Sequence, residues 1–511
     1  MALGTDHLAA IIPPDFTLGV ATAAFQIEGA VAEGGRGPSG WDAFTHEPGR
    51  IAGGATADTA CDHYHRMPQD VALLAELGVD SYRFSLSWPR IQPGGRGPVN
   101  QRGIDFYDRL LDELLARGIS PMCTLYHWDT PLPLEHAGGW LNRDTAYRLA
   151  DFAAIAAERF GDRVDRWVTI NEPTTVTLNG YGLGVHAPGQ AGLFDALPAA
   201  HHLILAHGLS LSALRAGGIT GEAGITNVYS PVVGAKDGMA HDVLVELFDV
   251  LHNKMFSDPV LLGRYPDFNP MLKPFLQYLR EIPDEDLAVM SQPLDFYGLN
   301  YYFPTRIGLG PGPSTGPDAV PDGLPEPLMQ RGADLPFHLA GWPGYARTEF
   351  GWPVAPDYLP VALAHMAERY PDLPPVYITE GGASFKDVVV PDALTNQPSV
   401  ADVRRVDYLA RHLEAALAAT APGGPAAGID LRGYYVWTLM DNFEWAAGYS
   451  QRFGLVYVDF ATQQRIRKSS FHWLKELAAR RRRDDGARTA AARGHTGAAD
   501  SMAGESAQPQ A

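Results

Sequence analysis

The feature that most constrains the fold of this chain is a pattern of helix, glycine and strand that occurs three times in succession. In each unit, apolar residues recur at helical spacing, a glycine follows, and a run typical of a buried strand begins soon after. The glycines, Gly78, Gly118 and Gly161, are spaced by roughly 40 residues. We expect each of them to take the left-handed conformation that ends many helices. Helix and buried strand at this pitch predict βα units on a parallel sheet.

Further strand candidates extend the pattern along the chain. Eight such units use about 320 residues, which is the scale of a (β/α)8 TIM barrel. We therefore predict an α/β fold with one (β/α)8 barrel domain, in which the remaining residues form long loops at the C-terminal face. The strand candidates are residues 16–22, 79–85, 119–126, 166–172, 223–228, 295–301, 375–380 and 431–438.

The remaining segments set the expected domain boundaries. We expect an N-terminal extension over residues 1–12, the barrel over 13–483 and a disordered tail over 484–511, because the tail lacks any apolar pattern. A last helix is expected at 471–482. Residues 304–343, rich in Pro and Gly, are expected to form a long loop in the wall over the barrel mouth.

The charge balance indicates which partners the chain disfavours. It carries 40 Lys and Arg against 59 Asp and Glu, a net charge of −19, so nucleic acid is not an expected partner. The basic run 480–483 is better explained as a solvated helix end. The N-terminus lacks a basic leader, and no apolar run approaches the ~18 residues of a membrane span. Cys61 and Cys123 are expected to be reduced thiols in a reducing compartment or simply core residues. We expect a cytoplasmic location and no membrane partner.

Two glutamates stand at the ends of strand-like runs. Glu172 follows 166–171 and precedes a proline, and Glu380 follows 376–379 and precedes two glycines. An unpaired carboxylate is costly to bury, and the C-terminal ends of barrel strands are where catalytic groups gather. Each glutamate alone is better explained by a pair with an arginine at a strand end. Two matching contexts favour the paired carboxylates of glycoside hydrolysis.

Aromatic and polar residues near the same strand ends are the types that bind sugars. Tryptophan faces pack on the C–H surface of a sugar ring, and amides, imidazoles and carboxylates bind its hydroxyls. The run 437–445 places a glutamate between aromatic residues, which suits a grip on two neighbouring hydroxyls. The candidates are Trp128, Trp352, Trp437, Trp445, Gln26, His127, Asn171, Asn300 and Glu444.

At these residues the chain resembles glycoside hydrolase family 1, the β-glucosidase family, over roughly residues 13–480. Many ordered motifs carry the resemblance, which makes chance similarity implausible. They are FTLGVATAAFQIEG at 16–29, YRFSLSWPR at 82–90, LYHWD at 125–129, TINEP at 169–173, LNYY at 299–302, ITEGG at 378–382 and DNFEW at 441–445.

The resemblance implies a retaining mechanism with Glu380 as nucleophile and Glu172 as acid/base. Their carboxyl groups are then expected about 5–5.5 Å apart. It also implies that Arg83, Asn300 and Tyr302 support the nucleophile and that no metal or organic cofactor is required. The residues implied to bind substrate are Gln26, His127, Trp128, Asn171, Trp352, Trp437, Glu444, Trp445 and Phe453.

Three local features bear on this expectation. The family usually has Asn after the nucleophile, whereas this chain has Gly381, which predicts a less rigid turn. Relatives that bind 6-phosphosugars carry Ser and Lys where this chain has Glu444 and its neighbours, so unphosphorylated sugars are expected. The H-x-H spacing of His63 and His65 follows a Gly- and Ala-rich loop rather than a strand, which argues against a metal site.

The predicted function is therefore that of a retaining exo-β-glycosidase. It is expected to release terminal non-reducing β-D-glucosyl residues from small β-glucosides and cello-oligosaccharides, with tolerance of β-galactosides and β-fucosides, as in cellulose degradation. Two alternatives stay open from the sequence. One is a transglycosylating enzyme, which shares the covalent intermediate, and the other is a non-catalytic sugar-binding barrel, which would be expected to lack one carboxylate.

Overall fold

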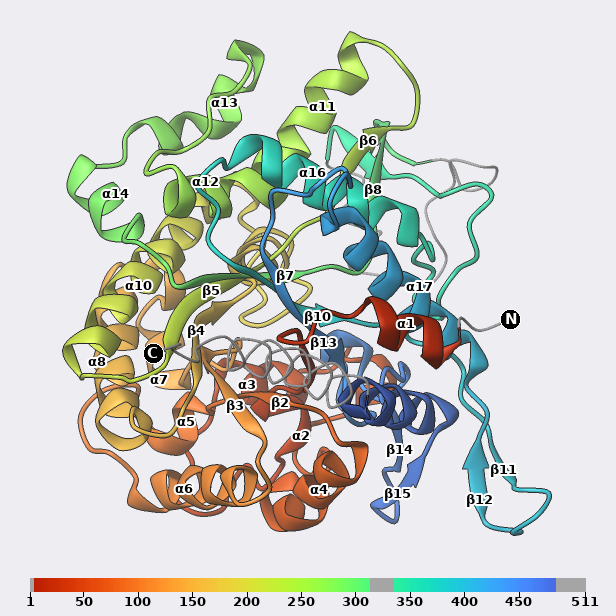
Figure 1. The fold of residues 1–511 in the computed structure, drawn as a ribbon. Helices are drawn as coiled ribbons and strands as arrows, with labels where there is room; N and C mark the ends of the chain where they lie inside the picture. The colour runs from red at the N-terminus through yellow and green to blue at the C-terminus, as the bar shows by residue number, and fades with distance from the viewer. Residues whose placement is uncertain (1–3, 313–334, 484–511) are drawn as a thin grey trace, which may run out of the picture.

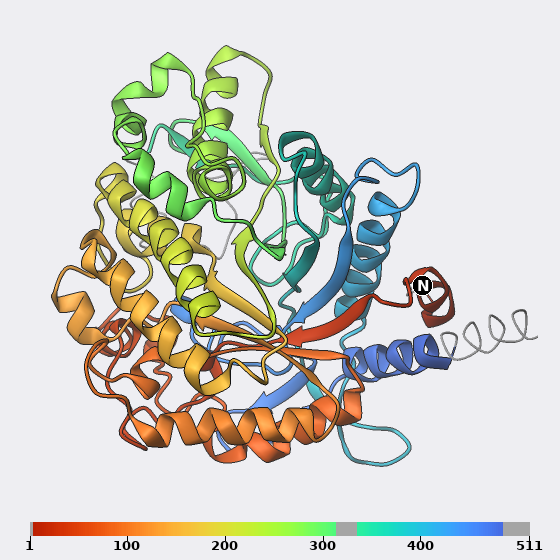
Figure 2. The same ribbon diagram turned by 60° about the vertical axis from the view of Figure 1, so that its left-hand side comes forward.

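Eight parallel strands close into a barrel at the centre of the molecule, and helices surround it (Figures 1 and 2). This computed structural model describes residues 4–312 and 335–483. Each barrel strand overlaps one of the eight predicted runs, so the (β/α)8 prediction is confirmed. In order around the barrel, the strands are β1 (Thr17–Ala21), β2 (Ser81–Ser85), β3 (Ser120–Tyr126), β4 (Arg166–Asn171), β5 (Glu222–Val228), β7 (Phe296–Asn300), β10 (Val376–Gly381) and β13 (Leu431–Trp437).

Most of the long helices pack around the barrel, whereas α11 packs against β6 and β8 outside it. In α6 (Gln101–Leu115), for example, Ile104, Tyr107, Leu111 and Leu114 are buried at helical spacing. The other long helices are α4 (His63–Leu77), α8 (Asp144–Phe160), α10 (Leu197–Ala216), α11 (Met239–Asp249), α16 (Leu359–Arg369), α17 (Val403–Thr420) and a helix over residues 469–483. Shorter helices are α1 (Thr5–Ile11), α2 (Ala24–Ile27), α3 (Gly40–His46), α5 (Trp88–Ile91), α7 (Leu132–His136), α9 (Pro173–Thr175), α12 (Met255–Leu261), α13 (Lys273–Leu276) and α14 (Asp284–Met290).

The three glycines of the repeated pattern do not all act in the same way. Gly78 and Gly118 take the expected left-handed conformation, with φ of 75° and 67°. The expectation for Gly161 is wrong, since its φ is −62°. A Cβ there would lie 2.5 Å from the carbonyl oxygen of Ala157 and 3.3 Å from Ile219. Close packing, and not backbone conformation, therefore requires glycine at this position.

Small sheets lie outside the barrel. β6 (Val232–Gly234), β8 (Thr305–Leu309) and β9 (Phe337–Leu339) form one sheet, so the predicted loop over 304–343 contains two short strands that the sequence did not indicate. Residues 313–334 of that loop lie outside the described residues. Two further pairs are β11 (Val389–Pro391) with β12 (Pro398–Val400) and β14 (Val456–Asp459) with β15 (Gln464–Arg467).

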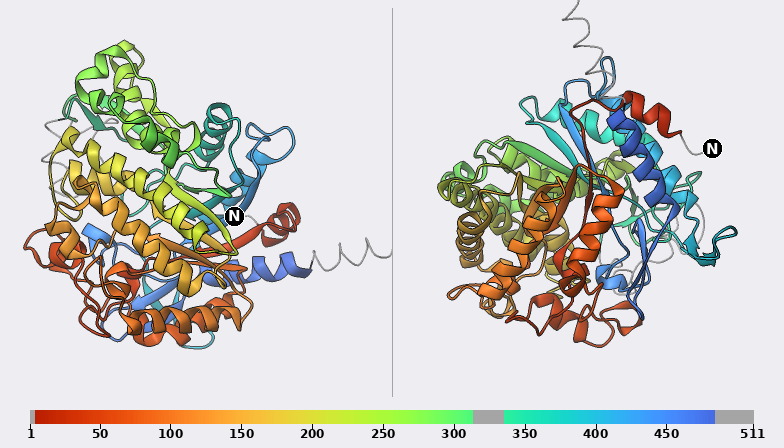
Figure 3. Two further views of the ribbon diagram at one scale, coloured as in Figure 1. Left: turned by 90° about the vertical axis from the view of Figure 1, so that its left-hand side faces the viewer. Right: turned by 60° about the horizontal axis from the view of Figure 1, so that its bottom comes forward.

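The N-terminal helix α1 lies beside the helix 469–483 (Figure 3), where Arg480 pairs with Asp6. The prediction that the arginines at 480–483 form a solvated helix end is wrong for Arg481. Its side chain is 9% exposed, and its Nη1 donates to the Phe16 carbonyl at 2.6 Å and to Asp80 at 2.7 Å. The arginine satisfies the buried Phe16 carbonyl and the half-buried Asp80 carboxylate at the start of the barrel. The predicted tail, 484–511, lies outside the described residues, and within the described part no helix is both long and apolar enough to span a membrane.

Candidate active site

Glu172 and Glu380 lie at the C-terminal mouth of the barrel, and both are buried, at 6% and 3% exposure. Glu380 is the second-last residue of β10, where it pairs in register with Asn300 of β7. Glu172 directly follows β4 with a left-handed φ of 45°, and its backbone N–H donates to Thr226 of β5 at 2.9 Å. The parallel register thus brings residues more than 200 positions apart to one end of the barrel.

The Glu380 carboxylate receives two strong hydrogen bonds. Nη1 of Arg83 donates to Oε1 at 2.5 Å, and the Tyr302 hydroxyl donates to Oε2 at 2.6 Å. Burial raises the pKa of Glu380, and both donors oppose that rise. They stabilise the charged form in a site that would otherwise penalise it.

The Glu172 carboxyl lies in a different environment. Asn300 donates to Oε1 and Thr175 donates to Oε2, each at 2.7 Å, and no cation contacts this carboxyl within the described residues. Burial and, next, the charge of Glu380 raise the pKa of Glu172 to about 7. The surroundings therefore favour the charged form of Glu380, and Glu172 is the carboxyl group that holds a proton near neutral pH.

An amide network connects the two carboxyl groups. Oδ1 of Asn171 accepts from Nη2 of Arg83 at 2.6 Å and from Nδ2 of Asn300 at 3.2 Å. The Thr379 hydroxyl donates to Oδ1 of Asn300 at 2.8 Å, which fixes the orientation of that amide. Arg83 and Asn300 thereby hold Glu380 and Glu172 in one rigid arrangement. The sequence pattern did not indicate the roles of Thr175 in α9 and Thr379 in β10, because a single threonine carries no distinctive signal.

Polar groups at the mouth have unused hydrogen-bonding capacity. Gln26 donates to the Phe443 carbonyl at 2.9 Å and to Glu444 at 3.4 Å. Oε1 of Gln26 and Nδ1 of His127 are buried and have no hydrogen-bond partner among the residues described. Burial and the charge of Glu380 raise the pKa of Glu444 to about 8. Buried polar atoms without partners are costly, so these groups are suited to bind a polar ligand.

Aromatic side chains form two groups around these polar residues. In the first, the ring centroid of Trp128 lies 4.4 Å from that of Trp445, and His127 lies 6.0 Å from Trp437. In the second, Trp352 lies 5.7 Å from Tyr302 and 5.9 Å from Phe453. Every predicted site residue thus makes a hydrogen bond or a ring contact with at least one other predicted site residue. Phe350, which stacks on Trp352 at 4.7 Å, was missed because a lone phenylalanine in a loop is not distinctive.

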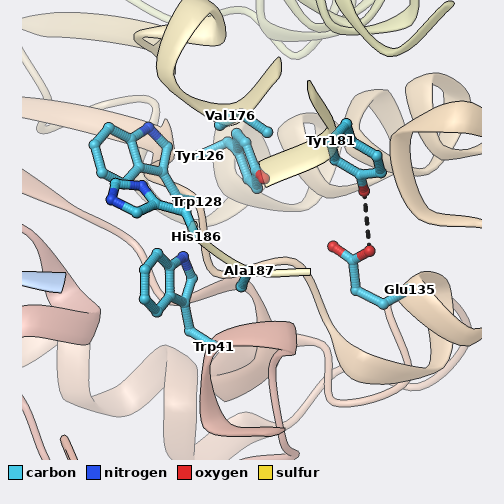
Figure 4. A pocket seen from close by; sticks show the side chains of 8 residues that line it. All are labelled: Trp41, Tyr126, Trp128, Glu135, Val176, Tyr181, His186 and Ala187. Atoms are coloured by element: carbon cyan, nitrogen blue, oxygen red, sulfur yellow. Dashed lines mark hydrogen bonds between the residues drawn. The ribbon is translucent and has the colours of Figure 1, made fainter. Parts of the chain in front are cut away.

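A small cavity is lined by Trp128 together with Trp41 and Tyr126 (Figure 4). Its volume of about 10 Å³ has room for one water molecule and not for a sugar ring. Glu135 lines it and accepts a hydrogen bond from Tyr181 at 2.9 Å. Burial raises the pKa of Glu135 to about 7. The sequence did not single out this carboxyl, which lies in a short helix without an apolar pattern.

The expectation of a less rigid turn at Gly381 is wrong. Gly381 is buried in β10, and a Cβ at this position would lie 2.3 Å from the hydroxyl oxygen of Tyr434. Tyr434 of β13 occupies the space that a side chain would need. The glycine therefore leaves room for the ring of Tyr434 beside Glu380.

The histidines of the H-x-H sequence contact carboxylates. Nδ1 of His63 lies 2.9 Å from Asp70, and His65 lies against Asp62 and Glu33 on the surface. In residues 4–312 and 335–483, no group of three or more His, Cys, Asp or Glu side chains is arranged to hold a metal ion.

Comparison with known proteins identifies close relatives. A family model described as glycosyl hydrolase family 1 matches residues 8–483. The chain is 42% identical over 471 residues to a β-glucosidase of Agrobacterium sp., covering 92% of this chain and 96% of the relative. It is 43% identical over 474 residues to a bifunctional β-D-glucosidase/β-D-fucosidase of Bifidobacterium breve, covering 92% and 98%.

The fold of this chain is also similar to solved structures. The virulence factor SghA of Agrobacterium tumefaciens superposes with a TM-score of 0.83 at 41% identity, covering 93% of this chain and 99% of that one. A family 1 β-glucosidase from Thermotoga maritima superposes with a TM-score of 0.81 at 38% identity, covering 92% and 98%.

Proposed function

The chain belongs to glycosyl hydrolase family 1 and is a retaining β-glycosidase of the β-glucosidase type, and we propose that Glu380 is its nucleophile and Glu172 its acid/base. The observation that carries this assignment is the contrast between the two buried carboxyl groups. Glu380 accepts hydrogen bonds from the guanidinium of Arg83 and the phenol of Tyr302. Glu172 accepts hydrogen bonds only from neutral donors and has a pKa of about 7.

In the first step, a carboxylate oxygen of Glu380 attacks the anomeric carbon while Glu172 gives its proton to the departing glycosidic oxygen. The bond between the anomeric carbon and the aglycone breaks, and a covalent glycosyl-enzyme forms. Arg83 and Tyr302 hold Glu380 in place for the attack. The raised pKa of Glu172 makes it an effective acid near neutral pH.

In the second step, Glu172 acts as a base. Glu380 has lost its charge in the ester, so that charge no longer raises the pKa of Glu172, and Glu172 can take a proton from water. The oxygen of that water attacks the anomeric carbon and displaces Glu380. The product sugar keeps the anomeric configuration of the substrate, because two inversions have occurred.

We propose that the sugar is a terminal non-reducing β-D-glucosyl residue. Glu444 and the unpartnered atoms of Gln26 and His127 would bind its hydroxyls, with Asn171, Trp128, Trp437 and Trp445 completing the sugar site. Trp352 and Phe453 would contact the aglycone. Small β-glucosides and cello-oligosaccharides are the proposed substrates, as in cellulose degradation, and the bifunctional relative supports activity on β-fucosides as well.

We further propose one barrel domain over residues 13–483 and a cytoplasmic location. The free, buried thiols of Cys61 and Cys123 support a reducing compartment. Of the two alternatives from the sequence, the non-catalytic barrel has no support among relatives named as β-glucosidases. Transglycosylation uses the same covalent intermediate, and analysis of products at high acceptor concentration distinguishes it from hydrolysis.

The assignment is tested with Glu380→Ala. We expect kcat on 4-nitrophenyl β-glucoside to fall by a factor of at least about 10⁴, because no covalent intermediate can form. Added azide should restore turnover and give a glycosyl azide of inverted anomeric configuration, since azide attacks from the face that Glu380 occupied. Near-normal turnover of Glu380→Ala without azide would overturn the proposal.

A further inference from the structure

Five charged side chains form a buried cluster beside the active site, which we call the charge cluster. Each of these side chains is at most 1% exposed. The cluster contains two cations and three carboxylates, and the proposed mechanism uses none of them. Its members are Lys468, Arg405, Asp387, Asp402 and Asp441.

Lys468 joins two segments that carry active-site residues. Its Nζ donates to Oδ1 of Asp441 at 2.6 Å and to Oδ2 of Asp387 at 2.5 Å. Asp441 lies three residues before Glu444, in the segment that leaves β13, and Asp387 lies seven residues after Glu380, in the segment that leaves β10. One ammonium group therefore ties the segment of the proposed sugar-binding carboxylate to the segment of the proposed nucleophile.

The segment that carries Glu444 is held from both sides. On one side, Asp441 also accepts from the backbone N–H of Gly454 at 2.9 Å and from Arg452 at 2.6 Å. On the other side, Gln26 donates to the carbonyl of Phe443 at 2.9 Å. The position of Glu444 is thus set by hydrogen bonds to its neighbours in sequence, in addition to its own contacts.

Arg405 fixes the other segment to the same cluster. It donates to Asp387 at 2.9 Å and to the carbonyl of Ala383 at 3.4 Å, three residues after Glu380, and it pairs with Asp402. Ser470, two residues after the lysine in the chain, also donates to Asp402, at 2.5 Å. Arg405 and Lys468 therefore anchor the segment after Glu380 independently of the barrel strands.

Burial of the Lys468 charge makes an unfavourable contribution to the free energy of folding. Burial lowers the pKa of Lys468, which shows that the site penalises its charge, and apolar residues in place of a buried ion pair are often at least as stable. Buried charges that persist at such a cost are best explained where they specify a geometry.

We propose that Lys468 is a positioning residue, which sets where Glu444 lies relative to Glu380 and so determines how tightly the site binds the sugar. This inference rests on the proposed function. It predicts that loss of Lys468 weakens sugar binding through Glu444, and that the loss is small once Glu444 can no longer bind as a carboxylate.

The test is a double-mutant cycle of Lys468→Met and Glu444→Gln, with kcat and KM measured on 4-nitrophenyl β-glucoside. We expect Lys468→Met to lower kcat/KM by about tenfold or more, mainly through KM, in the presence of Glu444. In the Glu444→Gln background, the same change should cost about threefold or less. A loss that is equal in both backgrounds, or no loss, would overturn the proposal.

Removal of a buried lysine can prevent folding, so Asp387→Asn provides a second route. It keeps the shape of the side chain and weakens the links from Lys468 and from Arg405 to the segment after Glu380. We expect a loss of about threefold or more in kcat/KM that disappears in the Glu444→Gln background. Additive losses from Asp387→Asn would contradict the inference just as those from Lys468→Met would.

Arg369→Met is the matched control. Arg369 pairs with the buried carboxylate of Asp258 beside α16, with Nε 2.8 Å from Oδ1. We expect this variant to lower the melting temperature and to leave kcat/KM within about twofold of the wild type. The proposed function is tested separately by Glu380→Ala and azide, so failure of the cycle alone would leave that assignment in place.

Discussion

The contact between Gly381 and Tyr434 gives a prediction whose size follows from the structure. In Gly381→Ala, the new Cβ would lie 2.3 Å from the hydroxyl oxygen of Tyr434 and 2.9 Å from its Cζ. Non-bonded heavy atoms prefer separations of about 3.5–4.0 Å, so either the tyrosine or strand β10 must move by roughly 1 Å. Overpacking of this kind costs about 1–3 kcal/mol.

The displacement also affects catalysis, because Gly381 directly follows Glu380 in β10. A misplacement of about 1 Å at a reacting group can cost about 10²-fold in rate. We expect Gly381→Ala to lower the melting temperature by several degrees and to lower kcat on 4-nitrophenyl β-glucoside by about ten- to a hundredfold. Thermal unfolding and steady-state kinetics measure the two effects separately.

Tyr434→Leu should relieve the clash. On its own it costs stability, since it removes a buried ring, but in the double variant with Gly381→Ala the two losses should be less than additive by about 1 kcal/mol or more. Gly428→Ala is the control, because a Cβ at Gly428 has no heavy atom within 4 Å and its φ is not in the left-handed region. If Gly381→Ala behaves like Gly428→Ala, or if the double variant is strictly additive, the packing argument is refuted.

Three further predictions concern the carboxyl groups. Glu172→Gln should slow glycosides with poor leaving groups far more than aryl glycosides whose phenols leave unaided, and equal slowing across a leaving-group series would contradict an acid role. Asn300→Ala removes a donor that lowers the pKa of Glu172, so the alkaline limb of kcat/KM, expected near pH 7, should move to higher pH, and an unchanged or lower limb would exclude this effect. Burial raises the pKa of Glu135 from 4.5 to about 7, so its contribution to stability is present below pH 4.5 and is lost as the pH rises through 7. Glu135→Gln should therefore be more stable relative to wild type at pH 8 than at pH 5, by up to about 3 kcal/mol in the free energy of unfolding measured with urea, whereas a pH-independent difference would show that Glu135 is ionised throughout.

The barrel was predictable because its signals are local. Each helix has its own apolar stripe, and each strand is a short apolar run, so all eight strands were found from residues close together in the chain. Glu172 and Glu380 were singled out for the same reason, because a carboxylate at the end of an apolar run is unusual in the local sequence alone. The two short strands at 305–309 and 337–339 were missed, since three- and five-residue runs in a Pro- and Gly-rich segment have no usable period.

The errors arose where a residue's role depends on a distant neighbour. Gly161 fits a helix end in sequence, yet the structure places it against Ala157 and Ile219, and Arg481 looks solvated in a basic run although it reaches Phe16. Gly381 was interpreted as a source of flexibility because Tyr434, 53 positions later in the chain, is invisible to any local pattern.

By itself, the sequence determined the (β/α)8 architecture and the family, and it singled out Glu172 and Glu380 as candidates, because periodicity and motif are properties of contiguous residues. Only the tertiary structure decided the electrostatics. The pKa of Glu172 depends on burial and on the charge of Glu380, and Asp441, three residues before Glu444, pairs with a lysine that follows β15. These are interactions through space between residues that the chain separates, and their strength depends on distance and desolvation, which no order of residues specifies.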